Sequence, residues 1–122
     1  MIEVLFVMVI IGILTAIAIP MYVAQRERAK NAVAREGGRA VAIALLSYVS
    51  ASGDNSWPPQ ADQTTLAQYL KANEWPVNPF TGLPMSPVAG PSDGDYTYES
   101  VPGSDKHRLR VYLHGAAPFL VP

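Results

Sequence analysis

Hydrophobic and polar positions divide the first half of this 122-residue chain into two helical stretches. Residues 4–19 carry no charge, and only one glycine and one threonine interrupt the aliphatic side chains. A helix that is apolar all round must be buried in lipid or among other helices. These sixteen residues span roughly 24 Å, and their flanking residues bring the stretch close to the roughly 30 Å core of a bilayer. We therefore predict that residues 1–22 form a transmembrane helix or a helix buried among other helices.

The second stretch, residues 23–52, mixes alanine-rich helix formers with charges at helical spacing and predicts a stem helix that continues to about residue 52. Apolar residues three or four positions apart define the face that a globular head would cover, with Gly37 in the gap: Val33, Val41, Leu45 and Tyr48. Residues 41–49 are apolar on all sides, so we expect cover there from more than one direction. The pair Gly37–Gly38 indicates either a flexible point or a close helix contact.

Residues 53–122 predict a globular head, which gives an α+β fold with a long N-terminal helix packed against a small antiparallel sheet. After a loop over 52–62, Asp62 predicts an N-cap for a short helix of about ten residues, 63–73. That helix places its apolar residues on one face: Leu66, Tyr69 and Leu70.

Two alternating segments, 95–100 and 107–113, predict an antiparallel pair of strands joined by 101–106. The alternation points Leu109, Val111 and Leu113 toward the stem. It points Arg108 and Arg110 outward, opposite Glu99 and Thr97. The apolar tail, 115–122, is expected to cover the core of the head or to meet a neighbouring subunit.

Between the short helix and the strands, residues 74–94 hold too many prolines and turn residues for regular structure. In this loop Asn78 and the pair Thr81–Gly82 supply turn chemistry. Trp75 and Phe80 are expected to anchor the loop to the head.

Charge is distributed unevenly along the chain, although the net charge is only −1. Residues 24–39 contain five basic and two acidic side chains, whereas residues 54–122 contain four basic and seven acidic ones. A basic stem beside the acidic head of a neighbour would favour longitudinal assembly, although exposed pairs contribute only about 0–1 kcal/mol each. The alternative is a solvated helix face without a partner. The basic run is short and lacks interleaved aromatic residues, so no specific nucleic-acid binding is predicted.

Catalytic motifs are absent from the sequence, and we expect no enzyme activity. There is no cysteine, hence no disulfide and no thiol nucleophile. The two histidines, His107 and His114, stand seven positions apart, so one continuous strand would point them to opposite faces. No cofactor is predicted. Weak calcium candidates are Asp93, Asp95 and Glu99, for which ordinary turn acids are the alternative.

The first stretch contains a single carboxylate, Glu3, with no lysine or arginine within reach on its own helix. An ionised carboxylate near hydrocarbon costs several kcal/mol unless it is paired, so its partner is expected from another chain or from a chain terminus. The order IEVL at residues 2–5, IIGIL at 10–14 and AIAIP at 16–20 resembles the N-terminal helix of type IV pilins and of type II secretion pseudopilins. Less specifically, WPVNPFTGLPM at residues 75–85 resembles a loop of some pilin-like proteins.

The resemblance implies that residues 1–22 form the core of a helical filament. In that family the glutamate is the fifth residue of the mature chain, behind an N-methylated Phe that a prepilin peptidase exposes. We therefore expect this sequence to lack a short basic leader, a Gly and two mature residues. The alternative is that this protein departs from the family pattern. Glu3 is then expected to pair with the N-terminal amine of a neighbouring subunit. The segment from Gly12 to Pro20 is the expected place for the helix to kink or melt, because both residues weaken helical hydrogen bonding.

The function that the resemblance implies is that of a structural subunit of a type IV pilus. Such a subunit sits in the cytoplasmic or inner membrane and then forms a homopolymeric surface filament for motility, adhesion or DNA uptake. Its partners would be copies of itself, the inner-membrane assembly machinery and the prepilin peptidase. Alternatives are the major pseudopilin of a type II secretion system and a monomeric, membrane-anchored extracytoplasmic binding module. Arg26, Arg28 and Lys30 alone would place the head in the cytoplasm, whereas the resemblance implies the reverse.

Overall fold

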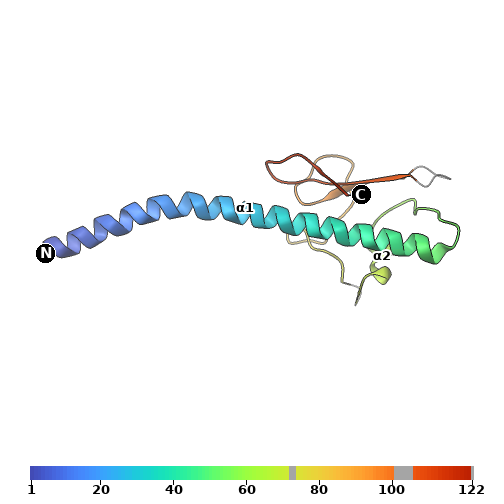
Figure 1. The fold of residues 1–122 in the computed structure, drawn as a ribbon, viewed down its shortest axis with the longest axis horizontal. Coiled ribbons are helices and arrows are strands. Elements are labelled where there is room, and N and C mark those ends of the chain that lie inside the picture. The colour runs from blue at the N-terminus through green and yellow to red at the C-terminus, as the bar shows by residue number, and fades with distance from the viewer. Residues whose placement is uncertain (72–73, 101–105, 122) are drawn as a thin grey trace.

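The computed structural model describes residues 1–71, 74–100 and 106–121, and shows one long helix with a small head on its second half (Figure 1). Helix α1 (Ile2–Ser52) joins the two predicted helical stretches without a break. It ends at Gly53, whose φ of 76° is the left-handed conformation that commonly closes a helix. At about 1.5 Å per residue, α1 is about 76 Å long.

Pro20 lies inside α1, and the helix continues through it. Figure 1 shows a smooth curve over the N-terminal half instead of the expected kink. A proline removes one backbone N–H and crowds the carbonyl four residues earlier, but the many intact turns on both sides keep this helix continuous. Melting of the segment from Gly12 to Pro20 concerns the assembled filament and stays a prediction.

The head contains an antiparallel sheet with the strand order β1, β2, β3. The predicted pair is confirmed as β1 (Tyr96–Ser100) and β2 (His107–Val111), with Thr97 opposite Arg110 and Glu99 opposite Arg108. Of the connection predicted over residues 101–106, residues 101–105 lie outside the described residues. The third strand, β3 (Phe119–Val121), comes from the apolar tail. Three residues are too few for alternation to be recognised in a sequence.

The predicted ten-residue helix is wrong in length. The structure has a four-residue helix, α2 (Gln63–Leu66), followed by one 3₁₀ turn, η1 (Ala67–Tyr69). Leu70 takes an extended backbone that ends the helical geometry, and residues 72–73 lie outside the described residues. The predicted cap is present, because an Asp62 carboxylate oxygen accepts the Thr65 N–H at 2.9 Å. Hydrogen bonding from the Thr65 side chain, together with this backbone N–H, lowers the pKa of Asp62.

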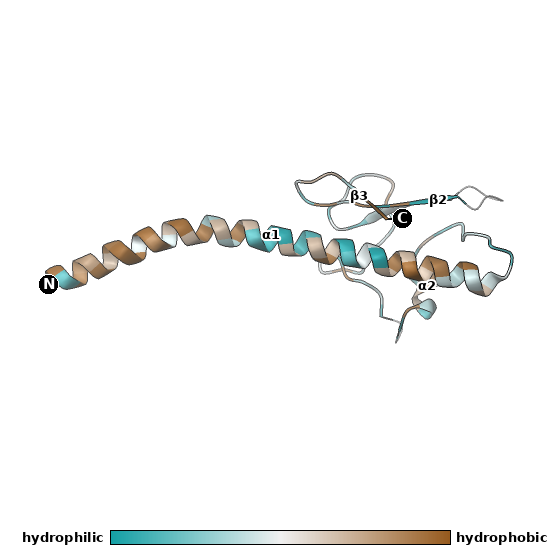
Figure 2. Ribbon diagram, in the orientation of Figure 1, coloured by the Kyte–Doolittle hydropathy of each residue, from teal (hydrophilic) through white to brown (hydrophobic). Residues whose placement is uncertain are grey.

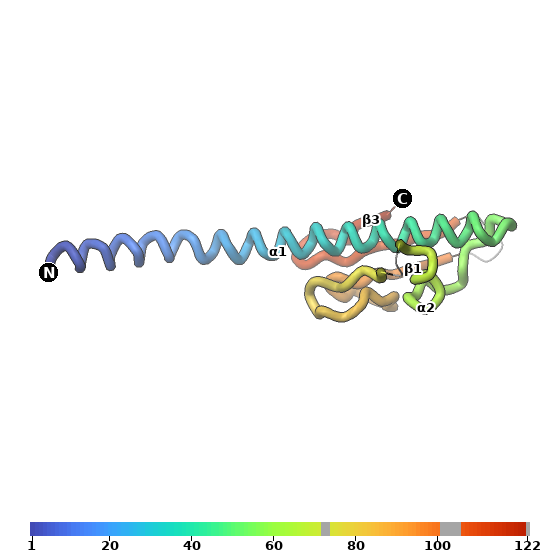
Figure 3. Tube along the Cα trace, turned by 90° about the horizontal axis from the view of Figure 1, so that it is seen from below, coloured from blue at the N-terminus to red at the C-terminus, as the bar shows by residue number. Residues whose placement is uncertain are grey.

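The head flanks α1 from more than one direction, with β2 and β3 packed on the helix and α2 and η1 in contact on another side (Figures 1 and 3). The predicted inward-facing side chains of Leu109, Val111 and Leu113 are buried as expected. The face of α1 beneath them consists mainly of small residues: Ala34, Gly37, Gly38, Val41, Ala44 and Leu45.

The two adjacent glycines of α1 form a close contact, and this settles the open alternative in favour of packing. A Cβ at Gly37 would overlap the Met85 sulfur, and a Cβ at Gly38 would overlap a Val111 methyl group. This approach turns the covered face toward Ala34. The prediction that Val33 lies on that face is therefore wrong, because Val33 remains 51% exposed.

Residues 41–49 are covered from more than one direction, as expected, but not on every side. Ile43 and Leu46 are more than half exposed on the side of α1 that faces away from the head. The head therefore covers one broad face of the stem and leaves the opposite face open.

Candidate functional site

The N-terminal half of α1 projects beyond the head and is not covered by it (Figure 1). Every residue from Met1 to Ala29 is exposed. Seventeen large hydrophobic side chains between Met1 and Val23 keep at least half of their surface accessible. Figure 2 shows hydrophobic colour almost throughout this segment, with polar colour gathering only farther along α1. By length and composition, α1 is able to cross a membrane. We call residues 1–29 the projecting half.

The three residues predicted to act in assembly all lie on the projecting half. Glu3 is exposed in the first turn of α1, and in the described part of the chain it forms no ion pair. A Cβ added at Gly12 would meet no atom within 4 Å in the described part of the chain, so the space beside that glycine is open. Pro20 is likewise exposed. Any partner of these residues must therefore come from outside the head.

Burial of the projecting half would be strongly favourable in free energy. Burial of one large aliphatic side chain contributes roughly 1.5–3 kcal/mol, and about half of that area is still exposed here. Each of the seventeen side chains therefore retains on the order of 1 kcal/mol. A bilayer or a bundle of similar helices supplies that cover equally well, because neither requires a particular face of α1.

Hydrogen bonds of Trp75, Asn78 and Gly82 hold the proline-rich loop, whereas Phe80 is half-buried beside His114. Trp75 is buried, and its indole N–H donates to the Met85 carbonyl oxygen at 2.7 Å. Asn78 is fully buried; its side-chain amide donates to the Asp93 carbonyl at 2.9 Å, and its side-chain oxygen accepts the Phe80 N–H at 2.8 Å. The backbone N–H of Gly82 donates to the Asn78 carbonyl, with φ of 74° at Gly82.

The three calcium candidates are used in separate contacts. Asp93 lies 2.7 Å from the Nδ1 of His114. The carboxylate of Asp95 accepts the Ser86 N–H and the Ser92 hydroxyl, at 3.2 and 3.1 Å. Glu99 lies 3.9 Å from Arg108 across the strands. Among the described residues, no group of three or more His, Cys, Asp or Glu side chains is arranged to hold a metal ion. The structure does not bring the three candidates together.

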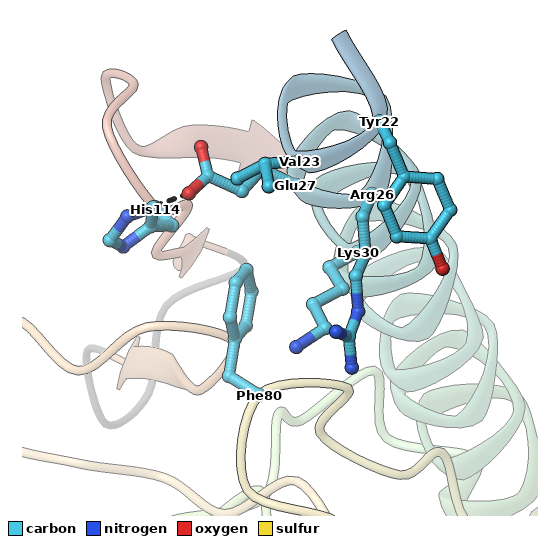
Figure 4. Close-up of a pocket in the computed structure, with 7 residues that line it drawn as sticks. All are labelled: Tyr22, Val23, Arg26, Glu27, Lys30, Phe80 and His114. Carbon is cyan, nitrogen blue, oxygen red and sulfur yellow. Dashed lines mark ion pairs between the residues drawn. The ribbon is translucent and has the colours of Figure 1, made fainter. Parts of the chain in front are cut away.

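At the point where α1 leaves the head, side chains from the stem and the head form a cavity of about 270 Å³ (Figure 4). We call it the junction notch and define it by its lining: Tyr22, Val23, Arg26, Glu27, Lys30, Phe80 and His114. Glu27 and His114 lie on one side of the notch, with a Glu27 carboxylate oxygen 3.7 Å from the His114 Nε2. Arg26 and Lys30 extend from α1 on the other side.

His114 fastens the stem to the head at this level. Its backbone N–H donates to the Asn31 side-chain oxygen at 3.0 Å, and the Asn31 amide donates back to the His114 carbonyl at 3.1 Å. Its ring contacts Asp93 of the head and Glu27 of the stem. The hydrogen bond to Asp93, with the nearby negative charges, raises the pKa of His114.

This role of His114 was not predicted from the sequence. The alternating pattern predicted a strand running to residue 113, but β2 ends at Val111, so strand alternation does not determine the orientation of the His114 ring. The contact with Asn31 joins residues 83 positions apart, and no local pattern reports such a pairing. His107 is half-buried and stacks on Trp57 with ring centroids 3.6 Å apart, and burial lowers its pKa.

Comparisons with protein-family models, with curated proteins and with solved structures found no match for this chain. The class of this protein therefore rests on its fold alone. It is an α+β protein with a long apolar N-terminal helix and a small three-stranded antiparallel sheet. That arrangement is compatible with a pilin-like fold.

Proposed function

We propose that this chain is a structural subunit of a type IV pilus, which polymerises through the projecting half of α1. One observation carries the proposal: a long helix segment, residues 4–21, is apolar on every side, extends beyond the folded head and remains exposed along its whole length. The resemblance of residues 2–20 to the pilin N-terminal helix supports the same function. In water this surface must be covered by lipid or by other chains.

The projecting half serves two successive environments in this proposal. Before assembly it anchors the subunit in the cytoplasmic or inner membrane, with the head outside. In the filament, the projecting halves of neighbouring subunits replace the lipid, so the apolar surface stays buried throughout. The partners of the chain are then its own copies, the prepilin peptidase and the inner-membrane assembly machinery.

Glu3 sets the register of neighbouring subunits in this proposal. A carboxylate among apolar helices is costly when it is unpaired, and the described residues supply no partner within the chain. The N-terminal amine of a neighbour is the complementary charge that an array of identical chains provides. Helices shifted along one another would leave both charges unpaired, so pairing selects one stagger.

The experiment compares Glu3→Ala with Glu36→Ala in cells that express the full chain. Glu36 is a matched control, because it is an exposed carboxylate of the same helix whose ion pair, among the residues that the structure describes, is with Arg39 at 3.2 Å. We expect Glu3→Ala to leave the amount of membrane-bound subunit unchanged and to reduce sheared filaments at least about tenfold. The reason is that the N-terminal amine of the neighbouring subunit would be buried without a counter-charge, which costs several kcal/mol. Glu36→Ala should assemble normally. A normal filament yield from Glu3→Ala would contradict the pairing.

A further inference from the structure

The junction notch presents two cations whose charge is not neutralised within the described part of the chain. Neither Arg26 nor Lys30 forms an ion pair there. The Lys30 ammonium lies 5.5 Å from the centroid of the Phe80 ring, on the inner side of the notch. Glu27, the acidic residue that lines the notch, turns toward His114 (Figure 4). The notch therefore separates a paired, acidic side from an unpaired, basic side.

The position of the notch along α1 relates it to the membrane surface. Residues 2–21 span about 30 Å as a helix, the thickness of a bilayer's hydrocarbon core. Tyr22 then lies at the boundary with the headgroups, where tyrosine is enriched in membrane proteins. Arg26 follows about 6 Å farther along the axis, within the headgroup layer.

We propose that the junction notch binds the phosphate of an anionic phospholipid in the leaflet beside the head. This inference rests on the membrane-anchored state of the proposed function and does not depend on polymerisation. The Arg26 guanidinium offers the planar fork that matches two phosphate oxygens, and the Lys30 ammonium supplies a second positive charge. Phe80 and Val23 line the notch beside them and fit the apolar part of a lipid.

Size and surrounding charge agree with this ligand. The cavity of about 270 Å³ is many times the roughly 30 Å³ that one water molecule occupies, so it admits a phosphate with part of its glycerol. The carboxylates of Glu27 and Asp93 both contact the His114 ring, which holds them on the far side of the notch. An acidic side chain from a second copy offers similar charge, but the level of the notch in the bilayer favours the lipid.

The test follows the Arg26 side-chain N–H resonance by NMR in the full ¹⁵N-labelled chain in zwitterionic micelles. The signal is assigned by its loss in Arg26→Gln. Phosphatidylglycerol, phosphatidylcholine and inorganic phosphate are titrated separately. We expect a saturable shift with phosphatidylglycerol, and half-saturation at a concentration at least about tenfold higher for the other two, because only phosphatidylglycerol combines a net negative charge with a position at the micelle surface.

Two variants separate the notch from general attraction to an anionic surface. Lys30→Gln should weaken the phosphatidylglycerol response at least about tenfold, because it removes a charged hydrogen-bond donor that contacts the phosphate directly. Arg28→Gln removes the same charge two positions from Arg26 but lies outside the lining of the notch, so it should change the response less than about twofold. Equal losses in both variants would overturn the proposal.

Other outcomes identify a different occupant and also overturn it. Equal affinity for inorganic phosphate would make the notch a free-anion site. A shift that depends on protein concentration without added lipid would assign the notch to a second copy. Flotation with vesicles separates this proposal from the proposed function: a chain that enters neither phosphatidylglycerol nor phosphatidylcholine vesicles contradicts membrane anchoring. A chain that enters both but shows no preference at Arg26 contradicts only the lipid site.

Discussion

The two halves of α1 belong to one unbroken helix but meet opposite environments. Residues 1–29 are exposed and carry bulky apolar side chains on all faces up to Val23. Residues 30–52 bury one face, and that face is built largely from glycine and alanine. Small residues let a sheet approach the helix axis closely, whereas bulky residues all round suit partners that arrive from every side. The head therefore covers α1 only in its second half, and the apolar surface of the first half requires cover from elsewhere.

Removal of residues 1–20 should have the largest effect on this comparison. The full chain is expected to require detergent or membranes, and the shortened chain to be a soluble monomer, since the removed segment carries most of the large exposed apolar side chains. Vesicle flotation and light scattering measure the change. Filaments formed by the shortened chain would show that the projecting half is not the core of the assembly.

Adjacent leucines of the stem test which face the head covers. Leu45 is fully buried and Leu46 is 56% exposed, so the two alanine variants remove the same atoms from opposite environments. Leu45→Ala should lower the free energy of unfolding by about 2–5 kcal/mol through the cavity it leaves. Leu46→Ala should cost less than about 1 kcal/mol. Denaturant unfolding of the full chain in detergent, followed by the head's tryptophan fluorescence, distinguishes them, and equal losses would refute the assigned face.

Glycines from the two halves provide the next comparison. Gly38→Ala places a Cβ against a methyl group of Val111, a stiff β-branched residue, and should cost about 1–3 kcal/mol of stability. Gly12→Ala meets open space within the chain and should favour the helix by up to about 1 kcal/mol. Denaturant unfolding measures the loss of stability in Gly38→Ala, and circular dichroism measures the helix content of Gly12→Ala. A stable Gly38→Ala head would contradict the close approach.

The smallest effect concerns the ion pairs at the level where the two halves meet. Because the pKa of His114 is raised by Asp93, its contribution to stability is fully present below the ordinary histidine pKa of about 6.5. That contribution is lost as the pH rises through the raised pKa. The unfolding midpoint of the wild-type head should therefore exceed that of His114→Asn slightly at low pH, with the difference shrinking toward alkaline pH. A constant difference would show that the charge of His114 plays no part.

Local patterns predicted the elements whose signals span several turns or alternations. Helical periodicity predicted α1 to residue 52, and alternation predicted β1, β2 and the register of Glu99 with Arg108. The cap at Asp62 was equally local. The Val33 prediction failed because the contacts at Gly37 and Gly38 rotate the covered face, and those contacts depend on residues of the loop and sheet.

The junction notch was beyond sequence analysis for the same physical reason. Its residues come from α1, from the proline-rich loop and from the turn after β2, and only the folded head brings them together. Glu3, Gly12 and Pro20 present the opposite case. They were predicted from one continuous apolar stretch, and a single chain leaves their partners undefined.

Electron microscopy of material sheared from cells that express this chain tests the central claim most directly, with mass spectrometry of the subunit's N-terminus from the same sample. Our account predicts long filaments built mainly of this chain, in which the projecting halves pack together at the centre and the heads lie outside. Membranes that hold the chain without any filament would contradict it.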